Sequence, residues 1–416
     1  MKKIPFYFLL ASLFLGSCKW HLNLNLNPDV KPDPAKPIVL TSRQSEKLAC
    51  DNAFSFNLFR EVATSDRKVN AFISPLSVTM ALGMLYNGTS PDARAEMVTA
   101  LQMNGFSDEE INEYYQTMSQ ALLSIDPLTA ISIANSIWCE KSYPVKQAFI
   151  NVNKKYYGAE VQNLDFTLPS TLKTINNWCA QKTNNKIPTV LDKIPSEVVM
   201  YLINAVCFKS KWESQFEKKN TQNEKFTLEN NTKKYVAMMD QTETFSYGAD
   251  EMLQCLEMPY GNQAFSMVVI LPAAGKTIDD IVNELDNNQW STILSTLQKC
   301  EVHVKFPRFK QECEFSLEDV VAHLGMQLIF QKGGNLNRIS DDPTLFVSEI
   351  KHKTFVEVNE EGTEAAAVTS VVISGMADAG PSIPIPFFAN RPFLYLIKEK
   401  STGAILFIGR MDDPQN

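Results

Sequence analysis

Residues 356–373 combine a strand pattern with a long run of small side chains, and this run limits the folds that are open to the chain. A single glycine interrupts the segment, and small residues followed by β-branched residues come after it. No proline lies between Phe355 and Gly380, so an extended conformation is allowed throughout. Such a strand could slide into a crowded sheet, although an ordinary Ala-rich linker between strands is the simpler alternative. Alternate residues of a strand share one face, and that face would consist only of small side chains, namely Thr363, Ala365, Ala367 and Thr369.

The composition of the whole chain narrows the classes of function. Its 416 residues carry 39 Lys plus Arg against 47 Asp plus Glu, a formal net charge of −8. This acidic balance argues against a nucleic-acid partner. With 44% hydrophobic and 21% charged residues, the chain is neither disordered nor a membrane bundle, and one large domain or two ordinary ones would fit. Only 16 glycines are present, so we expect no phosphate-cradling loop and no cofactor.

The N-terminus has the features of an export signal. Lys2 and Lys3 precede residues 4–15, an uncharged apolar run that is long enough for a signal peptide and too short to span a bilayer as a helix. Small residues then lead to Cys18, a pattern that is similar to the bacterial lipoprotein signal, in which this cysteine is acylated. We therefore expect residues 1–17 to be removed and Cys18 to attach the protein to a lipid bilayer. An ordinary secretory peptide cut nearby is the alternative.

Residues 18–41 are predicted to form a stiff, extended tether, because they are rich in Pro, Asn, Asp and Lys and have no periodic pattern of large hydrophobic residues. Lys19 follows the lipidation site where an acidic residue would favour the inner membrane, so outer-membrane attachment is preferred, with the periplasmic or the surface face left open. The folded domain is expected over residues 42–416. Thr41 or Ser42 is suited to cap its first helix, in which apolar residues recur at helical spacing at Ala49, Ala53, Phe56 and Phe59.

The cysteines after residue 18 do not form a disulfide framework. They are odd in number and irregular in spacing, and no CxxC pair suggests zinc, so we expect no metal site. Most have apolar neighbours and are predicted to be buried thiols. A bridge between Cys300 and Cys313 is left open. The seven are Cys50, Cys139, Cys179, Cys207, Cys255, Cys300 and Cys313.

Helical and strand patterns alternate along the middle of the chain without the regular strand–helix period of a doubly wound fold. They predict a mixed α+β fold with extensive sheet. Helices are expected over residues 72–84, 108–123 and 171–183. Strands are expected over residues 131–138, 200–208, 265–271, 300–306 and 355–358.

No complete motif of an enzyme is present. The patterns GxSxG, HExxH, GxGxxG and GxxxxGK[ST] are all absent from the sequence. A Ser-His-Asp site stays open, because its members need not be neighbours in sequence. The candidate bases are His303, His323 and His352, although a single histidine is more often structural than catalytic.

Five motifs in the expected order resemble those of the serpins, a family of serine-protease inhibitors, and the resemblance covers about residues 42–414. Residues 360–367, EEGTEAAA, match the hinge of the family's reactive loop, and their small side chains are those found in inhibitory members. Residues 390–395 and 408–410 match the C-terminal signature. Residues 72–78 match the start of the helix beneath the main sheet, and residues 204–212 match the third strand of that sheet.

The resemblance implies a fold of large mixed and antiparallel sheets surrounded by helices, with an exposed reactive loop at about residues 360–386. It also implies irreversible inhibition of serine proteases by a suicide-substrate mechanism. The protease forms an acyl bond to the loop, and the cleaved loop inserts into the main sheet as an extra strand and distorts the attached protease. The protein would then be a monomer without catalytic residues, and its partner a covalently bound protease. Alternatives are a non-inhibitory serpin that acts as a surface binding protein, an inhibitor of papain-like cysteine proteases and an unrelated hydrolase.

The resemblance also implies roles for individual residues. The hinge would comprise Glu360, Gly362, Thr363, Glu364, Ala365, Ala366 and Ala367. A polar "shutter" beneath the point where strands part would comprise Ser74, Ser77, Asn204 and His352. The "breach", where insertion begins, would contain Trp212 together with Arg308, the basic partner expected for Glu360.

The spacing of the family from Gly362 places the reactive bond between Met376 and Ala377. An unbranched, uncharged Met fits elastase-like, chymotrypsin-like or subtilisin-like pockets. No Lys or Arg occurs between Lys353 and Arg391, which argues against trypsin-like targets. The stretch after the expected bond is longer than in many members, so three other cut positions stay open, at Val368, Val372 and Ile373.

Overall fold

Two β-sheets organise the part of the chain that the structure, a computed structural model, describes: residues 33–65, 70–363 and 383–415. One sheet has six strands and the other has nine. Helices join and cover them, so the architecture is the mixed α+β class with extensive sheet that the sequence predicts. Within the described residues, no helix combines the length and the apolar character needed to cross a membrane.

The helices, in chain order, are α1 (Ser42–Ser65), α2 (Pro75–Tyr86), α3 (Pro91–Ala100), α4 (Asp108–Ser124), α5 (Gln147–Tyr157), α6 (Pro169–Lys182), α7 (Ile278–Glu284), α8 (Asn287–Thr296) and α9 (Glu318–His323), with short 3₁₀ helices η1 (Lys218–Asn220) and η2 (Leu328–Phe330). The strands are β1 (Asn70–Ile73), β2 (Ala130–Glu140), β3 (Glu160–Leu164), β4 (Met200–Lys211), β5 (Gln222–Thr227), β6 (Lys233–Ala249), β7 (Leu253–Pro259), β8 (Phe265–Pro272), β9 (Gln298–Pro307), β10 (Phe309–Ser316), β11 (Glu349–Asn359), β12 (Gly362–Thr363), β13 (Ile385–Phe388), β14 (Phe393–Glu399) and β15 (Ile405–Met411).

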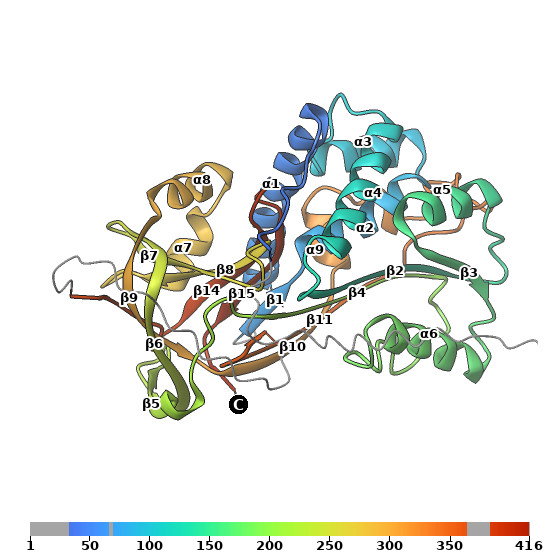
Figure 1. Cartoon of the computed structure of the whole chain (residues 1–416). Coiled ribbons are helices and arrows are strands. Elements are labelled where there is room, and N and C mark those ends of the chain that lie inside the picture. The colour runs from blue at the N-terminus through green and yellow to red at the C-terminus, as the bar shows by residue number, and fades with distance from the viewer. Residues whose placement is uncertain (1–32, 66–69, 364–382, 416) are drawn as a thin grey trace, which may run out of the picture.

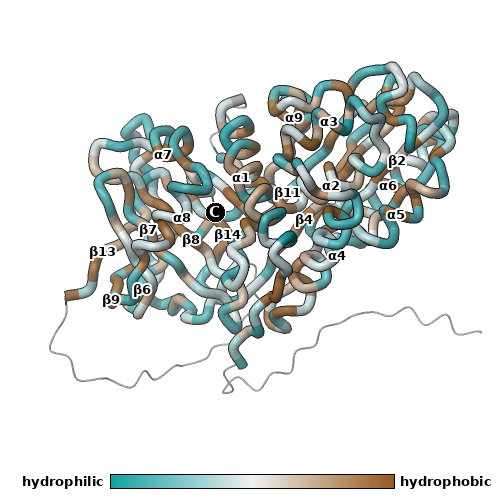
Figure 2. The backbone as a smooth tube through the Cα atoms, turned by 90° about the horizontal axis from the view of Figure 1, so that it is seen from above, coloured by the Kyte–Doolittle hydropathy of each residue, from teal (hydrophilic) through white to brown (hydrophobic). Residues whose placement is uncertain are grey.

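Figure 1 shows how these elements are layered. The six-stranded sheet runs in the order β10-β11-β12-β4-β2-β3 and separates α6 on one face from α2, α4 and α5 on the other. The nine-stranded sheet lies beside it, with α7 and α8 against it. Apolar side chains of both sheets and of α2 form the main core, and a smaller cluster fills the space between α6 and strands β2 and β4. Figure 2 shows the hydrophobic stretches meeting in this interior, with hydrophilic stretches prominent in the outer helices and connections.

Most of the expected elements are present, and one boundary is wrong. The helices predicted over residues 108–123 and 171–183 correspond to α4 and α6, and each predicted strand lies within a longer one. The helix predicted over residues 72–84, however, begins only at Pro75, because residues 70–73 form β1 and pair with β15. Ser74 stays extended, with φ −111° and ψ 93°, and Pro75 suits the first helical turn because it needs no amide partner there.

Thr41, rather than Ser42, caps α1. The Thr41 hydroxyl accepts a hydrogen bond from the amide of Gln44 at 3.2 Å, and the Gln44 side chain accepts one from the amide of Thr41 at 3.0 Å. This reciprocal pair is a capping box. It satisfies two of the amides that the first turn of a helix leaves without backbone partners.

The end of the predicted tether is docked on the domain. The amide of Ala35 donates to the carbonyl of Asn262 at 3.1 Å, and the amide of Ile38 donates to the Ser401 hydroxyl at 2.9 Å. Ile38 and Leu40 are also packed against the main core. The folded part therefore begins before residue 42, because two apolar side chains among the prolines find a surface to cover. The predicted signal peptide and Cys18 lie outside the described residues.

The cysteines of the described residues form no disulfides, which leaves the bridge considered between Cys300 and Cys313 unformed. Cys313 is buried and its sulfur accepts a hydrogen bond from the Gln311 amide at 3.2 Å. Five of the seven thiols are buried as predicted. The exceptions are Cys50 and Cys300, which are only half-buried.

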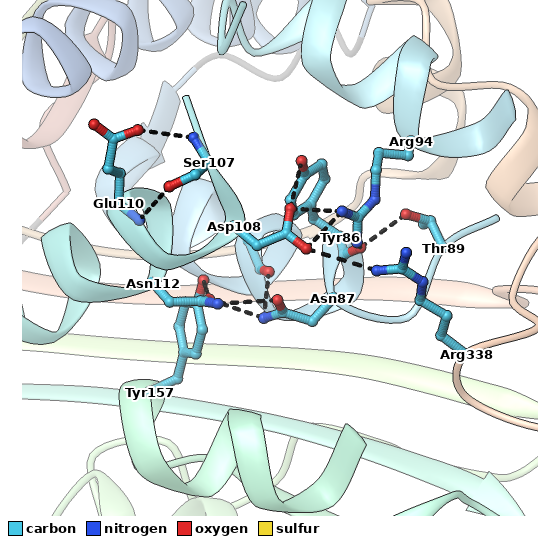
Figure 3. A network of polar contacts seen from close by, with 11 residues as sticks. Tyr86, Asn87, Thr89, Arg94, Ser107, Asp108, Glu110, Asn112, Tyr157 and Arg338 are labelled. Atoms are coloured by element: carbon cyan, nitrogen blue, oxygen red, sulfur yellow. Dashed lines mark hydrogen bonds and ion pairs between the residues drawn. The ribbon is translucent and has the colours of Figure 1, made fainter. Parts of the chain in front are cut away.

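Helix α2 packs against one face of the six-stranded sheet (Figure 1). All of its residues are buried, as expected for a helix that is apolar on every side. A polar network fixes its C-terminal end (Figure 3). In that network, Asp108 accepts hydrogen bonds from Arg94 at 2.5 and 2.7 Å and from the Tyr86 hydroxyl at 3.1 Å. Burial alone would raise the pKa of Asp108, but the bonds and charge of Arg94 outweigh it and leave that pKa below its usual value.

Candidate functional site

The seam between β4 and β11 is the central feature of the six-stranded sheet. The two strands run parallel and pair over seven positions, from Tyr201 with Glu349 to Cys207 with Phe355. Most neighbouring strands of this sheet are antiparallel, and parallel pairing is slightly weaker per residue. The pairing along the seam is therefore slightly weaker per residue than that of its antiparallel neighbours.

Strand β12 separates β4 from β11 beyond the last direct pair of the seam, Cys207 with Phe355. This end is called the upper end of the seam. The two residues of β12 lie between β11 and β4 and pair antiparallel with both. Gly362 lies between Asn359 and Lys211, and Thr363 lies between Val358 and Ser210. The residues assigned to the hinge thus begin inside the sheet, as a wedge one strand wide.

Gly362 is required at this position by the space available. Its φ of +150° lies in a region that other residues rarely adopt. A Cβ atom there would lie 2.1 Å from the carbonyl oxygen of Ser210 and 2.6 Å from the Cα atom of Lys211. Both are backbone atoms of β4, so no side-chain rotation would relieve the clash. Thr363 is fully buried, and its hydroxyl forms a 2.6 Å hydrogen bond with the hydroxyl of Tyr260.

Glu360 and Glu361, the two acids directly before Gly362, each have a basic partner. Glu360 is in contact with Arg308, at 2.5 Å between Oε1 and Nη2, which is the pairing expected from the sequence. The Thr221 hydroxyl also donates to Glu360 Oε1, at 2.7 Å. Burial alone would raise the pKa of Glu360, but the hydrogen bonds from Thr221 and Arg308 outweigh it and keep that pKa below its usual value. Glu361 pairs with Lys218, whose Nζ lies 2.6 Å from Oε1.

Trp212 holds residues 359–361, the hinge turn between β11 and β12, at the end of β4. Its indole Nε1 donates to the carbonyl of Asn359, and its amide donates to the carbonyl of Glu361, both at 3.0 Å. Its ring stacks on that of Tyr260, with centroids 4.4 Å apart. The residue that the resemblance assigns to the breach is therefore in direct contact with the hinge.

The four residues assigned to the shutter form one buried network across the seam. Asn204 and His352 face each other in the register of β4 and β11. The amide of Ser74 donates to His352 Nε2 at 3.0 Å, so the proton of the neutral ring resides on Nδ1, which donates to Asn204 Oδ1 at 2.7 Å. The Asn204 amide group donates to the hydroxyl and to the carbonyl of Ser77, the latter at 3.1 Å. The hydrogen bond between Asn204 and His352 is a polar link that must break if the strands part.

Sequence reasoning missed several members of the site. Asn135 of β2 accepts a hydrogen bond from Asn204 at 2.6 Å, and the Thr354 hydroxyl donates to the carbonyl of Phe72 at 2.6 Å. Asn135 could have been noticed, because an amide within an otherwise apolar strand needs a buried partner. Thr221 and Lys218 contact Glu360 and Glu361 because a turn brings them beside the hinge. No sequence pattern predicts these contacts.

The histidines do not form a catalytic triad within the described chain. His303 Nε2 lies 3.0 Å from Asp240, but no serine hydroxyl or cysteine thiol is hydrogen-bonded to that ring. His323 is exposed at the end of α9, and His352 belongs to the shutter. No group of three or more His, Cys, Asp or Glu side chains in these residues is arranged to hold a metal ion.

The remaining assigned residues lie outside the described part of the chain. They are the hinge residues Glu364, Ala365, Ala366 and Ala367, the expected reactive bond at Met376 and Ala377, and the alternative cut positions Val368, Val372 and Ile373.

Burial of His352 predicts that stability depends on pH. Complete desolvation lowers the pKa of His352 to about 3. Below about pH 6.5, the unfolded chain takes up a proton at this residue, while the folded chain stays neutral there. The free energy of unfolding should therefore be greatest above pH 6.5 and fall by up to about 1.4 kcal/mol per pH unit as the pH drops toward 3.

Urea unfolding at pH 7 and at pH 5 measures this effect. His352→Gln should lower stability at pH 7 but should lose less stability than the parent protein between the two values. His323→Gln is the matched control, because His323 is exposed, and it should keep the parent pH dependence. Equal losses in the parent and in His352→Gln would refute the assignment.

Comparison with known proteins places this geometry in a family. The sequence profile of the family "Serpin (serine protease inhibitor)" matches residues 49–414. Human leukocyte elastase inhibitor is 35% identical over 385 residues, which cover 89% of this chain and all of that protein. The native-state crystal structure of the thermophilic serpin tengpin superposes with a TM-score of 0.82 at 32% identity, covering 92% of this chain and 97% of the other. Human thyroxine-binding globulin, in complex with thyroxine, superposes with a TM-score of 0.82 at 25% identity, covering 90% of this chain and all of the other. The chain therefore belongs to the serpin family.

Proposed function

We propose that the protein inhibits serine proteases irreversibly, by inserting its cleaved reactive loop between β4 and β11. Protease inhibition in general is supported by the family and by relatives named for the inhibition of elastase. The observation that carries the mechanism is β12, because Gly362 and Thr363, two residues near the start of the loop, already lie between β4 and β11. The protein supplies no catalytic group, since the protease provides the nucleophile that attacks the loop.

The register of β12 leads directly to the register of the inserted strand. Continuing the antiparallel pairing one residue at a time sets Ala365 between Val356 and Phe208, and Thr369 between His352 and Asn204. The two flanking strands keep the alignment that they already have along the seam, because β12 and the seam share the same offset. Insertion then exchanges one parallel ladder for two antiparallel ladders.

Parity explains why the inserted segment needs small side chains. Thr363 points into the core, so Ala365, Ala367 and Thr369 would point the same way. The side chains that would flank them along this face are almost completely buried already. They are Val356, Thr354 and His352 on β11 and Phe208, Val206 and Asn204 on β4. Larger side chains on the inserted strand would overpack this layer.

The length of the loop suits the displacement of an attached protease. The expected bond follows Met376, and residues 362–376 in an extended strand would span about 50 Å at roughly 3.3 Å per residue. That distance is comparable to the diameter of a domain of this size. A protease joined to Met376 would be carried from the upper end of the seam to the lower end, where distortion stops deacylation.

A second candidate is a non-inhibitory serpin that binds a ligand at the surface. It is favoured by the structural likeness to thyroxine-binding globulin, which is described in complex with thyroxine. The small hinge residues weigh against it, because a carrier has no need of a face that fits the seam. Inhibition of papain-like cysteine proteases by the same loop is a variant of the first proposal.

We also propose that the mature protein is a monomer attached to a bacterial membrane, preferably the outer membrane, through acyl groups on Cys18. The support is the short apolar run that ends in small residues before this cysteine. A single cleavage before Cys18 and a mass increase from acyl chains are the expected results of mass spectrometry on the mature N-terminus.

Reaction with a panel of proteases tests the proposed inhibition. Purified protein should form SDS-stable complexes with elastase, chymotrypsin or subtilisin and none with trypsin, because the predicted loop lacks Lys and Arg. Mass spectrometry should find a released C-terminal fragment that begins at Ala377. Papain is included to test the cysteine-protease variant. Cleavage of the loop without any stable complex would favour the non-inhibitory alternative.

The parity of the inserted strand predicts opposite outcomes for two neighbouring substitutions. Ala365→Arg would place a guanidinium group in the buried layer, so the protease should cleave this variant as a substrate and form little complex. Glu364→Arg is the matched control: its side chain would point outward, beside the exposed Lys209, and complex formation should persist. The fraction of cleaved protein that carries a protease on denaturing gels measures both. Equal fractions for the two variants would contradict the register.

Glu360→Lys should increase spontaneous insertion or polymerisation. The change removes the acceptor of Arg308 and Thr221 and places a second cation beside Arg308. Size-exclusion chromatography of protein incubated at 37 °C should show faster loss of active monomer. Glu217→Lys is the control, because Glu217 is an exposed residue of the same region. An unchanged monomer lifetime would count against a role for the Glu360 pair.

A further inference from the structure

We propose that Lys218 is a positioning residue that keeps the β12 wedge inserted, because it neutralises the buried carboxylate of Glu361. This inference rests on the proposed insertion mechanism and extends it to a pair that is separate from Glu360 and Arg308. It concerns the conformation from which insertion starts, before any protease has cut the loop.

The two partners of this pair differ sharply in exposure. The Glu361 side chain is only 10% exposed, whereas that of Lys218 is 62% exposed. Lys218 Nζ lies 2.6 Å from Glu361 Oε1, and among the described residues no group forms a hydrogen bond with the other carboxylate oxygen, which is buried. Lys218 is therefore the cation that compensates a nearly desolvated negative charge.

The backbone around Glu361 links this charge to the wedge. The carbonyls of Glu360 and Glu361 accept hydrogen bonds from the amides of Phe216 and Trp212, at 2.9 and 3.0 Å. Both donors belong to the connection between β4 and β5, which also carries Lys218. Gly362 follows directly and lies against the backbone of β4. If the Glu361 side chain turned out to solvent, this turn would lose its fixed geometry and Gly362 would withdraw from the sheet.

The pairs of Glu360 and Glu361 hold the hinge turn from different directions. Arg308 lies at the turn between β9 and β10, and β10 is the outer neighbour of β11. Lys218 lies in η1, on the connection that leaves β4. The Glu360–Arg308 pair thus holds the turn from the β11 side of the opening, and the Glu361–Lys218 pair holds it from the β4 side. Together they fix the turn across the opening that the wedge occupies.

The unequal exposure predicts unequal effects of the two single substitutions. Removing Lys218 leaves a buried carboxylate without a compensating cation, which is far less favourable than leaving an exposed ammonium group alone. Lys218→Met should therefore displace the hinge, whereas Glu361→Gln should be mild. The double variant removes the uncompensated charge, so it should behave more like the parent protein than Lys218→Met does. A pair that acted only through surface attraction would give similar effects from either side.

Hydrogen exchange at the Trp212 amide measures the position of the hinge directly, since this amide bonds to Glu361. In Lys218→Met its exchange should be at least about tenfold faster than in the parent protein. Glu361→Gln, the double variant and Lys218→Arg should stay within about threefold of the parent rate, which is less than 1 kcal/mol of opening free energy. Lys219→Met is the matched control, because Lys219 is the exposed neighbour that contacts Glu217 instead.

The yield of covalent complex supplies the functional measurement. Lys218→Met should divert at least about half of the reacting protein to cleavage without a complex, because a withdrawn wedge delays insertion while deacylation continues. Parent-like exchange and yield in Lys218→Met, or equal effects of Lys218→Met and Glu361→Gln, would overturn the inference. If the parent protein formed no complex with any protease, the proposed function would fail, while the exchange measurement would still decide whether Lys218 holds the wedge.

Discussion

The parallel pairing of β4 with β11 is the interaction on which the rest of the structure depends. Seven residue pairs join the strands, and at the upper end two residues of β12 have already replaced the direct pairing. A backbone ladder satisfies its hydrogen bonds both when two strands pair directly and when a third strand lies between them. The ladder itself would therefore oppose the proposed insertion only weakly. What distinguishes the two arrangements is the set of side chains that cross the seam and the wedge that begins to separate it.

The residues at the upper end of the seam hold β12 between β4 and β11, and each does so for an identifiable physical reason. Gly362 is required because the backbone of β4 leaves no room for a Cβ atom. Trp212 donates to two carbonyls of the hinge turn, so the turn remains attached to the end of β4, beside the opening. Glu360 is buried and has two donors, and this gives a carboxylate a stable position inside the fold. The opening is thus a built feature of the folded state, and the end of a sheet that is merely frayed would show no such contacts.

Sequence reasoning could reach those parts of this arrangement that local patterns encode. The periodicity of residues 108–123 predicts α4. The motifs at residues 360–367 and 204–212 point to the hinge and to Asn204, whereas His352 is assigned only by resemblance. The predicted start of the helix at residue 72 is wrong, because residues 70–73 pair with β15 and form a strand. The docking of Ala35 on Asn262 and of Lys218 on Glu361 depends on how distant segments meet, and no local pattern specifies that meeting.

The polar shutter has a further consequence for the energetics of insertion. A buried polar link that is broken without replacement would cost about 1–3 kcal/mol for each group left without a partner. In the proposed inserted state, continuing the register of β12 would place Thr369 between His352 and Asn204, with its side chain on the same face as that of Thr363. A hydroxyl group both accepts and donates a hydrogen bond. The Thr369 hydroxyl would then accept a hydrogen bond from His352 Nδ1–H and donate one to Asn204 Oδ1, so that the link would be extended by one strand. A shutter of this kind would specify where the inserted strand comes to rest, which an apolar layer of the same volume would not do.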